Sequence, residues 1–123
     1  MKRCLIAIAL ILLWVVPSIA FEPPNGYMSY TATLTDDAAA VSNPGYLYGI
    51  VFVTDGSNAL SVDIYDSASA TGTKLVPTLQ LAASPRIQTL NFDPPVPYNT
   101  GVYVDVTVSG GGSIAYMVYY RKQ

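Results

Sequence analysis

Alternation of apolar and polar residues runs through most of this chain and limits what it can fold into. The clearest case is residues 101–108, Gly-Val-Tyr-Val-Asp-Val-Thr-Val, in which a valine occupies every second position. Residues 60–66 follow the same rule, with Leu60, Val62 and Ile64 on one face. A period of two places successive side chains on opposite faces of a β-strand. Both segments are therefore predicted to be half-buried strands with an apolar inner face.

Seven short segments of this kind are separated by turn sequences rich in Gly, Pro, Asn and Ser. They are residues 27–35, 46–54, 60–66, 74–81, 86–92, 101–108 and 113–120. Short strands at such spacing are typical of antiparallel sandwiches and small barrels. We therefore expect an all-β fold: a single antiparallel β-sandwich, jelly-roll or immunoglobulin-like, with about seven strands. The long apolar segment 46–54 is expected to be central.

The connections carry their own expectations. Residues 101–108 and 113–120 are predicted to form a hairpin, because the glycine-rich residues 109–112 can supply positive φ angles. Residues 36–42 are expected to form one helical turn or a loop, and Asp93-Pro94-Pro95 a turn between strands.

The first 20 residues read as a secretory signal. Lys2 and Arg3 precede an apolar run, and Pro17 and the small residue Ala20 follow it. These are the three regions of a signal peptide, with cleavage predicted after Ala20. The alternative is an uncleaved apolar helix acting as an anchor, and contact with a membrane is expected only in that case. Residues 21–27 are predicted to be an extended leader and residues 28–123 the sandwich, exported to the periplasm, cell surface or exterior.

Charge and composition exclude several classes of function. Two of the six basic residues lie in the first 20 residues, whereas all eight acidic residues follow them. An acidic domain lacks the basic patch that phosphate binding requires, so no nucleic acid partner is expected. The chain has no histidine, and its one cysteine is Cys4, so the domain is not stapled by disulfides.

Catalytic, cofactor and metal sites are not expected. Asp63 and Asp66 are the candidate carboxylates for acid–base work, and both fall at a strand end, where aspartates are usually solvated. Asp55 with Asn58, or the pair Asp36-Asp37, could supply oxygen ligands for calcium, but neither has the spacing of a metal-binding loop. The chain is therefore predicted not to be an enzyme.

Ten tyrosines, all after residue 20, are the most unusual part of the composition. Tyrosine combines a large contact area with a polar end, which suits protein interfaces and carbohydrate stacking. The predicted interaction surface comprises Tyr65, Tyr103, Tyr119, Asp55 and Asn58.

The order of these segments resembles the small β-sandwich virion proteins of tailed phages, such as head-decoration and head-fibre modules. The resemblance rests on residues 45–53, 60–66, 72–74, 101–106 and 117–121, the last reading Met-Val-Tyr-Tyr-Arg. It implies a non-enzymatic protein that binds a capsid or a symmetric copy of itself, and no catalytic residue carries over. Proteins added to a phage head in the cytoplasm need no signal. Either translation starts at Met28, or the domain belongs to an exported surface or filament protein or to a virus whose proteins enter a membrane.

Three hypotheses follow, in order of preference. The first is a structural or interaction module that forms homo-oligomers or decorates a capsid or another surface. The second is a secreted carbohydrate-binding or adhesin-like module that uses exposed tyrosines to bind glycans. The third is an enzyme.

Overall fold

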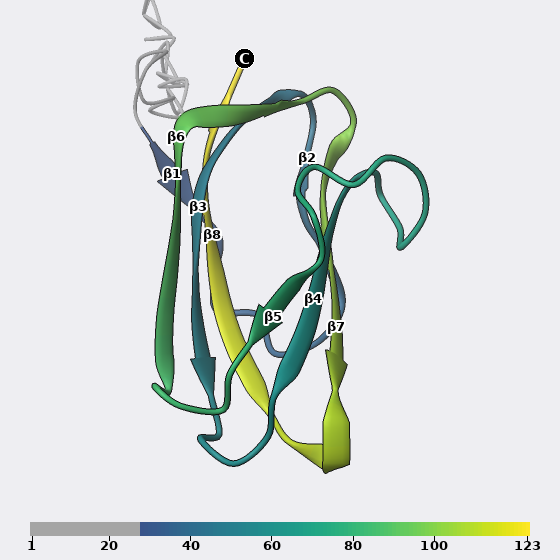
Figure 1. The fold of residues 1–123 in the computed structure, drawn as a ribbon. Helices are drawn as coiled ribbons and strands as arrows, with labels where there is room; N and C mark the ends of the chain where they lie inside the picture. The colour runs from purple at the N-terminus through teal and green to yellow at the C-terminus, as the bar shows by residue number, and fades with distance from the viewer. Residues whose placement is uncertain (1–27) are drawn as a thin grey trace, which may run out of the picture.

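Two antiparallel sheets packed face to face make up the computed structural model, which describes residues 28–123 (Figure 1). The described chain is therefore all-β, and the predicted sandwich is confirmed at this level. The predicted signal or apolar helix (1–20) and the leader (21–27) lie outside the described residues.

Each sheet has four strands. Sheet A has the order β1 (Ser29–Tyr30), β8 (Ile114–Lys122), β3 (Gly45–Thr54) and β6 (Ile87–Tyr98). Sheet B has the order β2 (Ala38–Ser42), β7 (Gly101–Val108), β4 (Leu60–Asp66) and β5 (Leu79–Leu81). The first strand pairs with the last, β2 with β7, β3 with β6 and β4 with β5. The chain is thus paired like one long hairpin whose middle is the β4–β5 connection.

The core between the sheets follows from the alternation. In β4, Leu60, Val62 and Ile64 are buried, as the sequence predicts. The largest fully buried side chains on sheet A are Leu47, Ile50, Phe52, Tyr98, Tyr116 and Val118. As expected from its long apolar run, β3 is central, because it pairs with both β6 and β8.

The predicted hairpin between residues 101–108 and 113–120 is wrong. β7 belongs to sheet B and β8 to sheet A, so the connection crosses from one sheet to the other. A short 3₁₀ turn, η1 (Ser109–Gly111), makes the crossing, with Gly110 and Gly111 both at φ 77°. Alternation told which face of each strand is buried, but not which strand lies beside it.

The structure has eight strands because residues 38–42 form β2. Its alanine-rich sequence has little intrinsic β-propensity, so residues 36–42 were expected to form a helical turn or loop. Pairing with β7 overrides that preference, and the Asp37 carboxylate accepts a hydrogen bond from the Val106 N–H at 2.7 Å. The strand arises from a long-range partner rather than from its own sequence.

The predicted turn at Asp93-Pro94-Pro95 lies inside β6. Leu47 pairs with Val96 but Gly49 pairs with Asn91, so β6 carries extra residues opposite Tyr48. This irregularity bends β6 across one end of the sandwich toward sheet B (Figure 1). Two predicted strands are shorter than expected, since only β1 and the three-residue β5 remain of residues 27–35 and 74–81.

Two buried tyrosines allow a direct test of the packing. The Tyr116 hydroxyl donates a hydrogen bond to the Asp36 carbonyl at 2.7 Å, whereas the Tyr98 hydroxyl finds no partner among the described residues. Removing a bonded hydroxyl loses the net contribution of that hydrogen bond, but removing an unbonded one costs nothing in hydrogen bonding. We expect Tyr116→Phe to lower the free energy of unfolding by about 1 kcal/mol and Tyr98→Phe to leave it unchanged or raise it. Equal losses in chemical denaturation would contradict this packing.

Candidate interaction surface

The five residues predicted to form an interaction surface lie on three separate parts of the molecule. Tyr65 of β4 and Tyr103 of β7 are cross-strand partners on the outer face of sheet B. Tyr119 of β8 lies on the outer face of sheet A, where it pairs with Tyr30. Asp55 and Asn58 lie in the loop between β3 and β4. The five therefore do not form one site.

Asp55 and Asn58 hold two loops together. One Asp55 oxygen accepts hydrogen bonds from the Ser57 and Asn58 N–H groups at 2.7 and 3.1 Å. The other accepts from the Asn58 amide at 3.0 Å and from the Ser113 N–H at 3.2 Å. These bonds, the Ser57 bond foremost, lower the pKa of Asp55 to about 2. The pair ties the β3–β4 loop to the β7–β8 crossing.

Asp66, one of the two carboxylates considered for catalysis, caps the turn between β6 and β7. Its oxygens accept hydrogen bonds from the N–H groups of Asn99, Thr100 and Gly101 at 2.9, 2.7 and 3.3 Å. Burial raises the pKa of Asp66, but the three backbone donors outweigh it and lower the pKa overall. A carboxylate held in this way is suited to structure rather than to proton transfer.

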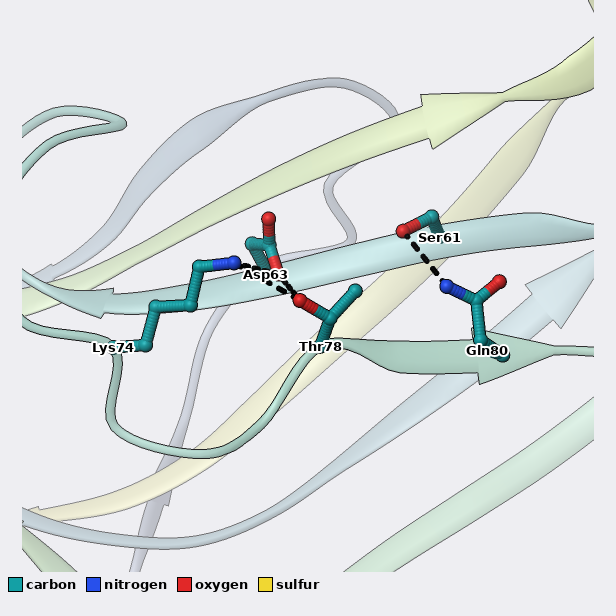
Figure 2. Close-up of polar contacts among 5 residues, drawn as sticks. All are labelled: Ser61, Asp63, Lys74, Thr78 and Gln80. Atoms are coloured by element: carbon teal, nitrogen blue, oxygen red, sulfur yellow. Dashed lines mark hydrogen bonds and ion pairs between the residues drawn. The ribbon is translucent and has the colours of Figure 1, made fainter.

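The outer face of sheet B is polar and organised around Asp63. Figure 2 shows the side chains of Lys74 and Thr78 reaching the same Asp63 carboxylate. The Lys74 ammonium lies 2.9 Å from Asp63 Oδ1, and the Thr78 hydroxyl donates to that oxygen at 2.5 Å. Gln80 donates to Ser61 at 3.4 Å beside them. Hydrogen bonds from Lys74 and then Thr78 lower the pKa of Asp63.

Asp105 lies directly across from Asp63 on β7. Burial raises its pKa, and the negative charges of Asp37 and Asp63 raise it further. Folding therefore lowers the pKa of Asp63 and raises the pKa of Asp105. Both carboxylates lie on a sheet face, and Asp63 is already paired with Lys74. The Lys74 ammonium also lies 5.8 Å from the centre of the Tyr65 ring, so it covers part of that aromatic surface.

Most of the outer face of sheet A is apolar, with Arg121 lying over the Tyr46 ring at one end. The exposed large hydrophobic residues of the described chain are Met28, Tyr30, Val53 and Ile87, at 56, 66, 42 and 63% exposure. Strand register places Tyr30, Val53 and Ile87 on this face, and Met28 lines a hollow within it. We define the apolar face as Met28, Tyr30, Tyr48, Gly49, Val51, Val53, Ile87, Thr89, Asn91, Ala115, Met117 and Tyr119. None of its side chains is charged.

A shallow hollow of about 230 Å³ lies within the apolar face. It is lined by Met28, Tyr48, Gly49, Val51, Thr89, Asn91 and Tyr119. At Gly49, a side chain would clash with the Leu90 carbonyl, 2.4 Å from the position of a Cβ. Tyr119 is the predicted interaction residue that belongs to this face. Met28, Val53 and Ile87 were not among the interaction residues predicted from the sequence. The nearly continuous apolar run that includes Val51 and Val53 nevertheless indicates that both faces of this strand are apolar.

The chain matches no protein-family model, and no characterised protein is detectably similar to it in sequence. Across residues 28–123, no helix has the length and apolar character needed to cross a bilayer. In the same part of the chain, no three His, Cys, Asp or Glu side chains gather where they could hold a metal ion. Function is therefore inferred from the chemistry of the two outer faces.

The opposed pKa shifts of Asp63 and Asp105 give a matched pair of substitutions. Because folding lowers the pKa of Asp63, its charge stabilises the fold above the ordinary value of 3.8, and that contribution is lost as pH falls through the lowered pKa. Folding raises the pKa of Asp105, so its contribution is favourable below 3.8 and is lost as pH rises through the raised pKa.

Near neutral pH we expect Asp63→Asn to lower the free energy of unfolding by about 0.2–1 kcal/mol, the range of exposed ion pairs. Asp105→Asn is expected to raise it, because it removes a carboxylate that its neighbours repel. Denaturation midpoints at neutral pH and at pH near 3 check both signs. The account fails if the two substitutions shift stability in the same direction at neutral pH.

Proposed function

We propose that this protein is a non-enzymatic structural module that assembles, through the apolar face of sheet A, with copies of itself or with the surface of a virion or cell. One observation carries the proposal: the large exposed hydrophobic side chains gather in one patch of the outer face of sheet A, and no side chain of that patch is charged. Contiguous exposed apolar patches mark interaction sites in soluble proteins, because leaving them in water is unfavourable.

The distribution of charge supports the choice of face. Sheet B carries Asp63 and Asp105 on its outer face, with Asp37 beside them, so two such faces would repel each other. The apolar face presents no such barrier to a neutral partner or to a second copy. Three of the carboxylates considered for chemistry, Asp55, Asp63 and Asp66, are engaged in loop caps and in the Asp63–Lys74 pair, which favours a structural role over a catalytic one.

We further propose that the sandwich is a jelly roll. Support comes from its pairing of first strand with last and of each inner strand with its counterpart. An immunoglobulin-like sandwich pairs its first two strands instead. Jelly rolls occur in viral capsid proteins and in lectins, so the fold is compatible with a virion role and with export alike. Export itself rests on the signal-like residues 1–20.

Carbohydrate binding is the second candidate. The cross-strand pair Tyr65 and Tyr103, beside Asp63 and Asp105, offers aromatic surface with hydrogen-bond acceptors. It ranks lower because both rings are half-buried and Lys74 covers part of Tyr65. Glycan-array binding that Tyr103→Ala abolishes would place this function first.

Self-association is tested by placing a charge at the centre of the apolar face. Val51 pairs with Thr89 and Met117 in the middle of that face, so a lysine there would have to be desolvated on assembly. We expect Val51→Lys to weaken association of the full-length chain at least ten-fold, about 1.4 kcal/mol.

The matched control is Thr107→Lys, on the exposed outer face of sheet B. It is expected to leave association unchanged, and circular dichroism checks that both variants fold. Sedimentation velocity over a range of concentrations gives the readout. A wild-type chain that stays monomeric at millimolar concentration, and binds no virion or cell surface, would refute the proposal.

A further inference from the structure

The free edge of β6 is the longest regular stretch of unpaired strand backbone in the described chain. β6 ends sheet A, and residues 87–91 pair with β3 without interruption before the irregularity at Asp93. The other edges are less suited to pairing. β1 has two residues and β5 has three, while a bulge next to Ala40 interrupts β2.

The hydrogen-bond register shows which backbone groups point outward. The Thr54 N–H donates to the Arg86 carbonyl, so Arg86, Gln88 and Leu90 direct their backbone groups toward β3. Ile87, Thr89 and Asn91 alternate with them and direct their N–H and C=O groups away from the sheet. Within residues 28–123 no strand lies beside that edge to receive them.

This edge lacks the features that usually protect strands from pairing. Natural edges carry lysine, proline, bulges or covering loops. Residues 87–91 read Ile-Gln-Thr-Leu-Asn, with no charge and no proline, whereas Pro85 and Pro94 lie just beyond each end. The side chains of Ile87, Thr89 and Asn91 also belong to the apolar face. An exposed edge and an exposed face therefore coincide on the same residues.

The outward backbone groups of residues 87–91 are complementary to those of a second copy. In antiparallel pairing about a two-fold axis at Thr89, each of Ile87, Thr89 and Asn91 faces a residue whose N–H and C=O also point outward. No charged side chain lies between Ile87 and Asn91 to oppose the approach. The same pairing sets Ile87 opposite Asn91 and joins the edges by about six backbone hydrogen bonds.

We propose that β6 pairs antiparallel with β6 of a second copy, joining two A sheets into one continuous sheet with a doubled apolar face. This inference rests on the proposed function, because it specifies how the self-association occurs. The apolar faces of the two copies then lie side by side, so that the dimer offers a larger surface to further copies or to a capsid.

Three changes in the full-length chain test the pairing by sedimentation velocity. Thr89→Pro removes the central outward donor without touching a bond to β3, and is expected to weaken association at least ten-fold, while Thr89→Ser leaves it unchanged. Ile87→Lys and Asn91→Asp each place an unpaired charge at the joined edge and should weaken association about three- to ten-fold. The double exchange Ile87→Lys/Asn91→Asp sets the two new charges opposite each other across the edge and should restore it.

The outcomes separate this inference from the proposed function. Recovery of association in the double exchange supports β6 pairing even if Thr89→Pro fails to fold. If the wild type associates and Val51→Lys weakens it, but none of the edge variants has an effect, β6 pairing is overturned and assembly through the apolar face stands. If the wild type does not associate at all, the proposed self-assembly fails and β6 pairing fails with it.

Discussion

Period-two alternation is the constraint on which the rest of this structure depends. Each strand must turn one set of side chains inward, and the sandwich is stable because apolar residues such as Ile50, Ile64 and Val104 fill the space between the sheets. The core requires only that the inner faces are apolar, so the outer faces of the two sheets can differ in chemistry. Sheet B turns Asp63 and Asp105 to solvent, while sheet A turns out a second apolar surface.

The two outer faces therefore differ in chemistry, one acidic and the other apolar, and the composition alone does not reveal this difference. On the acidic face, Lys74 and Thr78 engage Asp63, while the charges of Asp37 and Asp63 repel that of Asp105. The exposed side chains of the apolar face would be stabilised by being covered. The free edge of β6 borders the same face. This distribution of charge and apolar surface is the basis of the proposed assembly through sheet A.

Alternation made the buried residues of β4 and the central place of β3 predictable. Pairing was not predictable, because a strand pattern names a face and not a neighbour: β7 and β8 look like a hairpin but lie in different sheets. The alanine-rich β2 was not predicted for the same reason, since its partner β7 is far away in the sequence. The predicted interaction residues do not form one site, because Tyr65 and Tyr119 lie on opposite faces of the sandwich. The strand order alone determines which face each residue occupies.

Amide hydrogen exchange at increasing protein concentration tests most directly whether the edge and face of sheet A form the assembly surface. The N–H groups of Ile87, Thr89 and Asn91 point away from β3, whereas those of Gln88 and Leu90 point toward it. We predict that the first three exchange rapidly in dilute solution and slow at least ten-fold on concentration, while the other two stay protected throughout. Exchange of the outward amides that is independent of concentration would contradict the account.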